Sequence, residues 1–64
     1  MRNEEKARIY EECIRESDRL QRENSKLKSE FAGFIPTQVQ AVIDRNDKRI
    51  ANLVIQLENL FRSE

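Results

Sequence analysis

The sequence has little of what most enzymes and metalloproteins use. It contains no histidine and a single cysteine, Cys13, which excludes an internal disulfide and removes the usual ligands of a zinc site. Tryptophan is absent, and glycine and proline occur once each. No Gly-rich phosphate loop, metal-ligand spacing or Ser/His/Asp set occurs. We therefore expect a protein that is not an enzyme, with no catalytic, cofactor-binding or metal-binding residues and no small-molecule substrate.

Long apolar runs and an excess of one charge are also missing. No apolar run exceeds three residues, as in Leu53-Val54-Ile55, which excludes a transmembrane span and a signal peptide. We expect no membrane partner and a cytoplasmic location. Twelve basic residues balance 12 acidic ones, and this balance makes strong nucleic-acid binding less expected.

Charged helix formers are abundant, and apolar residues recur three and four positions apart. This spacing is typical of amphipathic α-helices. It predicts an all-α fold, a single domain over residues 1–64 in which two helices, at about 3–32 and 37–62, form an antiparallel coiled-coil hairpin. The apolar stripe of each helix follows positions a and d of a heptad, labelled a to g. The stripe of the first helix is Tyr10, Cys13, Ser17, Leu20, Asn24, Leu27 and Phe31. That of the second is Val39, Ile43, Asn46, Ile50, Leu53, Leu57 and Leu60.

The two stripes align when the chain is folded back about position 35. At the open end Tyr10 then lies opposite Leu60, and nearer the turn Asn24 lies opposite Asn46. A buried asparagine is costly unless its amide finds a partner, and two side-chain amides satisfy one another. We therefore predict a buried polar pair, Asn24 and Asn46. Two alternatives stay open: both asparagines face water, or Asn24 pairs with its symmetry mate in a parallel dimer.

The segment between the stripes holds the only glycine and the only proline. We expect Gly33 to end the first helix in the left-handed conformation at C′. Pro36 prevents the helix from continuing. Thr37, followed three residues later by Gln40, predicts a capping box at the start of the second helix. These features predict a short helix–helix turn.

A hairpin of this size buries little surface and needs a further source of stability. We expect a homodimer, because apolar residues also lie beside the stripe at e positions and converge near the open end. These predicted interface residues are Ala7, Ile14, Val54 and Phe61. Ile9 and Val42 add apolar area on the opposite, g side. A self-complementary patch most often closes a two-fold dimer, here a four-helix bundle. The alternative is ordinary exposed hydrophobic surface.

Another apolar side chain, Ile55, occupies an outward f position of the second helix, near Ala51, Val54 and Lys48. We expect Ile55 to anchor an unknown protein partner. The leading functional class is therefore a small protein–protein interaction module: an adaptor, an inhibitor, a regulator or an assembly subunit. A further hypothesis is that the chain is a coiled-coil segment of a larger protein.

A stripe of basic residues follows the outer face of the first helix, with acidic residues at b positions beside it. The stripe comprises Arg8, Arg15 and Arg22 at f with Arg19 and Lys26 at c. In its length and predicted dimer of hairpins, the chain resembles Rop, the plasmid RNA-binding modulator. This resemblance is architectural and involves no shared motif. It implies an alternative function as a nucleic-acid-binding regulator that uses the basic stripe.

Overall fold

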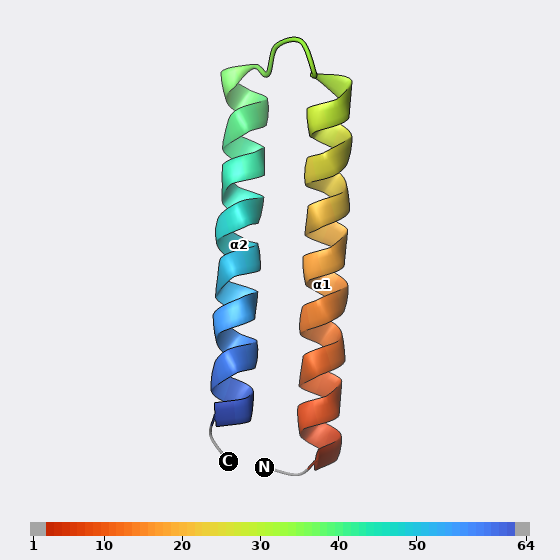
Figure 1. Cartoon of the computed structure of the whole chain (residues 1–64), viewed down its shortest axis with the longest axis vertical. Helices are drawn as coiled ribbons and strands as arrows, with labels where there is room; N and C mark the ends of the chain where they lie inside the picture. The colour runs from red at the N-terminus through yellow and green to blue at the C-terminus, as the bar shows by residue number, and fades with distance from the viewer. Residues whose placement is uncertain (1–2, 63–64) are drawn as a thin grey trace.

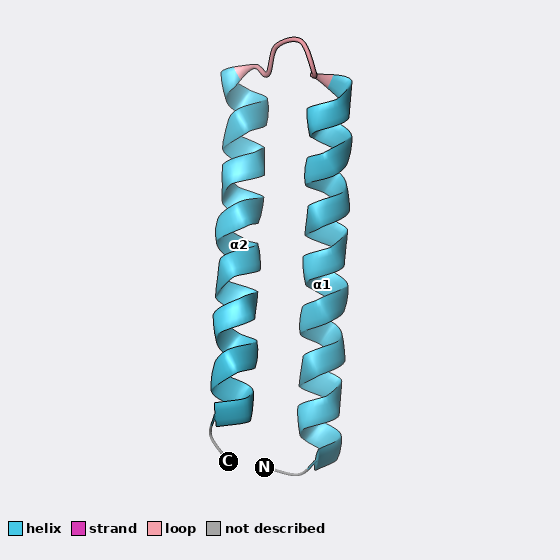
Figure 2. Cartoon of the chain, in the orientation of Figure 1, coloured by secondary structure: helices cyan, strands magenta, loops and turns pink. Residues whose placement is uncertain are grey.

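The computed structural model describes residues 3–62, so the ends of the predicted domain, residues 1–2 and 63–64, lie outside the described part. Two α-helices, α1 (Asn3–Glu30) and α2 (Thr37–Arg62), run antiparallel and pack against each other (Figure 1). Within residues 3–62 there is no strand (Figure 2). The molecule is a rod of 47 × 14 × 12 Å. The predicted all-helical fold with two packed helices is confirmed.

The core is a single layer of side chains between the two helices. Cys13, Leu20 and Leu53 form one buried cluster, against which Ile50 and Leu57 pack. Nearer the turn Ile43 is only 2% exposed, and at the open end Leu60 is also buried. Each helix is apolar on one face, so two helices alone bury that face and leave the other faces in solvent.

At the open end the buried seam departs from the predicted stripe. Tyr10 is 44% exposed, whereas Ile9, predicted on the flank, packs against the core cluster and Lys6 is buried. An α-helix has 3.6 residues per turn rather than 3.5, so a nearly straight helix such as α1 turns its heptad positions by about 20° per heptad (Figure 1). This drift brings Ile9 toward α2 and moves Tyr10 to the rim of the seam.

The end of α1 also differs from the prediction. The helix stops at Glu30 rather than near residue 32. No described residue has a positive φ, so the predicted left-handed conformation of Gly33 is wrong. The Phe34 amide instead donates to the Phe31 carbonyl at 3.1 Å. A turn closed between residues three apart needs no left-handed residue, which is the physical reason for the difference.

The start of α2 is displaced by one residue from the predicted capping box. The Gln40 amide donates to the Pro36 carbonyl at 2.9 Å, so Pro36 takes the N-cap position and Thr37 is the first helical residue. The Gln40 side chain donates to Asp44 at 2.9 Å. Proline is tolerated here because the first amides of a helix have no intrahelical acceptor.

Because Gly33 has no positive φ and an added Cβ would meet no atom within 4 Å, we expect Gly33→Ala to stabilise the protein. The gain should be about 0.4–1 kcal/mol, since alanine restricts the unfolded chain. Urea denaturation at fixed protein concentration measures it, and the neighbouring Ala32→Gly should lower stability by a similar amount. A loss of stability in Gly33→Ala would show that Gly33 is left-handed after all.

Candidate functional site

A polar layer interrupts the apolar seam in the half of the rod nearer the turn. Asn24 and Asn46 are each 5% exposed, and the Asn46 Nδ2 donates to the Asn24 Oδ1 at 2.9 Å. An unsatisfied buried polar group costs about 1–3 kcal/mol, so the two amides lie together at much lower cost than either would alone. The structure thus brings these two sequence-predicted residues into direct contact.

Two acidic residues complete this layer. The Asn24 Nδ2 donates to the Asp47 carboxylate at 2.9 Å, and the Asn46 Nδ2 also donates to the Glu23 carboxylate at 2.7 Å. Charged acceptors make these bonds stronger than neutral ones. The sequence analysis missed both acids. Each acid is next to one asparagine in the sequence and flanks the seam. That position could have been used to predict the two contacts.

A second interhelical contact was also missed. Arg49 of α2 approaches both carboxylate oxygens of Glu16 of α1, with Nη2–Oε2 at 2.9 Å and Nη2–Oε1 at 3.2 Å. Both residues occupy g positions, so they meet across the same side of the hairpin. The Arg49 side chain is 53% exposed, and exposed pairs contribute only about 0–1 kcal/mol. The pair therefore supports the register more weakly than the asparagine layer.

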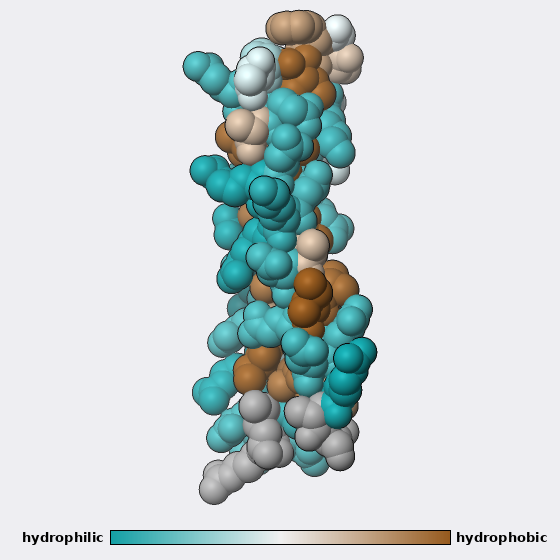
Figure 3. Space-filling view, turned by 90° about the vertical axis from the view of Figure 1, so that its left-hand side faces the viewer, coloured by the Kyte–Doolittle hydropathy of each residue, from teal (hydrophilic) through white to brown (hydrophobic). Residues whose placement is uncertain are grey.

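Four of the six large apolar side chains that the described residues leave exposed lie toward the open end, whereas Phe34 lies at the turn. We call this surface the open-end patch. It comprises Ala7, Tyr10, Ile14, Val54 and Phe61, all exposed. The Tyr10 and Phe61 rings join the two helices, with centroids 5.9 Å apart and planes at 68°. Tyr10 was not among the predicted interface residues. A space-filling view onto the α2 side shows hydrophobic atoms at the surface in the half nearest the termini and also at the turn end (Figure 3).

Ile55, the predicted partner anchor, follows Val54 but points to a different side of α2. It is 53% exposed, and the neighbouring Ala51 and Lys48 are exposed too. A step of one residue turns a helix by about 100°, so Ile55 lies outside the open-end patch. The structure therefore separates Ile55 from the other predicted interface residues.

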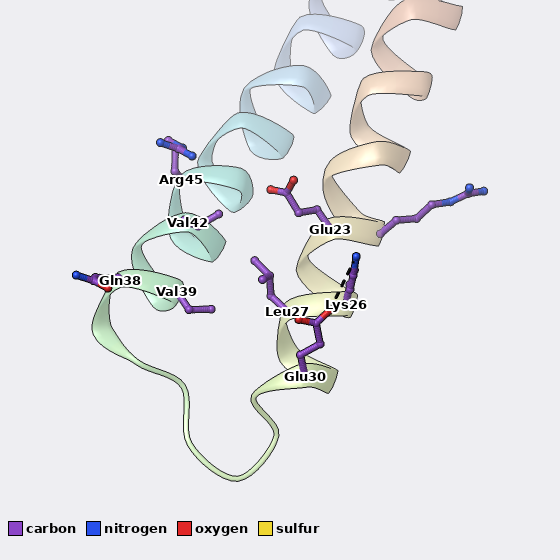
Figure 4. Close-up of a pocket in the computed structure, with 9 residues that line it drawn as sticks. Glu23, Lys26, Leu27, Glu30, Gln38, Val39, Val42 and Arg45 are labelled. Carbon is purple, nitrogen blue, oxygen red and sulfur yellow. Dashed lines mark ion pairs between the residues drawn. The ribbon is translucent and has the colours of Figure 1, made fainter.

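A groove lies between the helices near the turn, on the g side (Figure 4). Its volume is about 780 Å³, and Leu27, Val39 and Val42 form its apolar floor. The rim carries charges of both signs, with Lys26 and Glu30 paired at 3.9 Å. The charges on its rim are therefore partly compensated.

The residues of the predicted nucleic-acid face are all exposed, but only some of them are free of acidic partners. Arg22 pairs with Asp18 at 3.0 Å, and Lys26 pairs with Glu30. Within residues 3–62, three members of the stripe make no ion pair: Arg8, Arg15 and Arg19. Intrahelical pairing thus reduces the positive field of the stripe toward the turn.

Comparison of the chain with models of protein families, with curated proteins and with solved structures gives no match. In the part of the chain that the structure describes, no group of His, Cys, Asp or Glu side chains is arranged to hold a metal ion. The Cys13 thiol is 4% exposed and lies in the core. Neither α1 nor α2 is long and apolar enough to cross a bilayer.

The asparagine layer predicts a coupled response to mutation. Replacing either Asn24 or Asn46 by Leu leaves a buried amide with fewer partners and should cost about 1–3 kcal/mol of unfolding free energy. The double variant removes both amides, so it should cost less than the sum of the single variants by about 1 kcal/mol or more. Urea denaturation of the four proteins gives this coupling energy.

The matched control is Asn52→Leu with Asn59→Leu, at exposed positions of α2. These substitutions should change stability by less than about 0.5 kcal/mol each. Additive losses from Asn24→Leu and Asn46→Leu would contradict the view that the two amides stabilise each other.

Proposed function

We propose that this protein is a small non-enzymatic protein–protein interaction module that acts as a homodimer of helical hairpins. The observation that carries the proposal is the open-end patch. Four of its members, Tyr10, Ile14, Val54 and Phe61, are each 44–52% exposed although they are large and apolar. A second copy of the same chain offers the same patch, as a two-fold interface requires.

The energetics of a two-helix rod support this assembly. A chain of 64 residues buries only a modest part of its surface as a monomer. Each further 100 Å² of apolar surface that a second copy covers contributes about 2.5 kcal/mol. Between Ile50 and Leu57, α2 has few polar residues, so it is apolar over much of its circumference. Such a helix is typical of the inside of a bundle.

In this proposal Ile55 serves a different contact. Its outward position on α2 keeps it clear of the dimer interface, so it stays available to a protein of another sequence. A half-exposed isoleucine beside a small residue and a lysine suits a partner with an apolar pocket and an acidic rim. The dimer would then be an adaptor, an inhibitor or a subunit of a larger assembly.

Sedimentation velocity of two neighbouring variants tests the dimer. Val54→Asp places a charge in the patch, whereas Ile55→Asp makes the same kind of change at similar exposure on the outer side of α2. We expect the unsubstituted chain to sediment as a dimer at tens of micromolar. Val54→Asp should weaken dimerisation about tenfold or more, since the change occurs twice per dimer.

Ile55→Asp should leave dimerisation within about threefold of the unsubstituted chain. A 7.6 kDa species in the unsubstituted chain would refute the homodimer. An equal loss of affinity in both variants would refute the assignment of the interface to the open-end patch.

The alternative function, a Rop-like nucleic-acid-binding regulator, is favoured by the three arginines of the stripe that make no ion pair: Arg8, Arg15 and Arg19. The ion pairs of the other two basic residues and the net charge of zero weigh against it. We therefore expect no binding to a hairpin RNA at about 50 mM salt. Binding that falls steeply by about 200 mM salt, and that Arg8→Gln with Arg15→Gln abolishes, would replace our proposal with this alternative.

A further inference from the structure

The open-end patch is one half of a longer face of the hairpin. On α1 the seven-residue spacing that links Ala7 to Ile14 continues to Gln21 and Lys28. On α2 the same spacing links Phe61 and Val54 to Asp47 and Gln40. All eight residues are exposed. This e side is therefore apolar toward the open end and polar toward the turn.

The antiparallel register sets which of these residues share a level along the rod. Contacts near the asparagine layer join residues whose numbers add up to about 70, such as Asn24 and Asn46. The e positions that add up to 68 therefore lie within about 3 Å of the same level, since a helix rises about 1.5 Å per residue. The four levels are Ala7 with Phe61, Ile14 with Val54, Gln21 with Asp47, and Lys28 with Gln40. Each level is thus uniform in polarity, with two apolar levels followed by two polar ones.

A second copy can pack on this face with its turn at the opposite end and with full overlap. That arrangement places each helix against its own symmetry mate. Val54 then faces Asp47 of the second copy, Ile14 faces Gln21, and Phe61 faces Gln40. Every apolar residue would be covered by a polar one, which desolvates polar groups without giving them partners. The chemistry of the face therefore disfavours this arrangement.

The opposed copies can instead slide until only the open ends overlap. The backbone outline of the rod is 47 Å by 14 Å, or about 650 Å² for each copy. Half of it gives a total buried area of about 650 Å², below the roughly 1,000 Å² that a specific interface needs. Full overlap gives about 1,300 Å², within the range of stable complexes. The small size of the face therefore disfavours a staggered dimer.

We propose that the second copy packs on the e side in register, with both turns at the same end and the two-fold axis along the rod. This inference rests on the proposed homodimer. Each α1 then lies beside the α2 of the second copy, and all neighbouring helices are antiparallel. Ile14 meets Val54, Ala7 meets Phe61, and the two polar levels face each other. No like charges meet within the four levels.

The rim of the same interface carries one unfavourable contact. Exposed Glu11 and Glu58 share a level at the b positions, so carboxylates of the two copies come near one another. Salt screens such exposed charges within about 8 Å at physiological ionic strength. The in-register dimer should therefore bind somewhat more tightly as salt increases, the opposite of an interface held by ion pairs.

Distances between spin labels distinguish the three arrangements. Each label is attached to a new cysteine in a Cys13→Ala background, or in Cys13→Val if alanine lowers the helical content. One site is Phe34→Cys, since Phe34 is 77% exposed at the turn, and the other is Glu5→Cys at the exposed open end. Sedimentation and circular dichroism of each labelled protein check that it is still a helical dimer.

In the in-register dimer both sites should give intermolecular distances below about 30 Å, because neighbouring helix axes in a bundle lie only about 8–10 Å apart. A distance near or above 47 Å, the length of the rod, at residue 34 would overturn the inference. A long distance at residue 34 with a short one at residue 5 would indicate the staggered dimer. A labelled protein that sediments as a monomer would refute the proposed homodimer itself.

Discussion

The hydrogen bond from the Asn46 side-chain amide to the Asn24 side-chain carbonyl determines how the two helices slide against each other. Apolar side chains at the seam would tolerate a shift by one heptad, because one leucine or isoleucine replaces another at similar cost. An amide does not tolerate it, since a shift of seven residues would separate the two asparagines and place Asn24 opposite Leu53 or Val39. One polar layer therefore selects one register for the whole rod.

This layer is stable because it is not closed off from the surface. Glu23 and Asp47 lie at its two edges, accept one hydrogen bond each from the amides and keep their charges in contact with water. The desolvation that makes buried charges costly is thus avoided, while the charge still strengthens the bonds. Every buried side-chain polar atom among the described residues has a partner.

The small size of the hairpin explains why so much apolar surface stays exposed. Two helices bury one face each, and the drift of a straight helix against its heptad turns Tyr10 out of the seam at the open end. The Tyr10 ring then packs edge-to-face on Phe61, at the side of the hairpin rather than in its core. The same rotation thus enlarges the apolar surface that stays exposed at the open end.

The sequence by itself determined the two helices and favoured the register and the asparagine layer, because these depend on spacing within each helix and on one local turn. Only the tertiary structure decided that Ile9 packs in the seam and that Tyr10 lies at its rim. A strict heptad pattern does not include the gradual rotation of a straight helix. The tertiary structure also decided the conformation of Gly33, because a hydrogen bond between Phe34 and Phe31 closes the turn without a left-handed residue. The acidic partners of the asparagines depended on it too, because side-chain contacts across a seam require both helices to be in place.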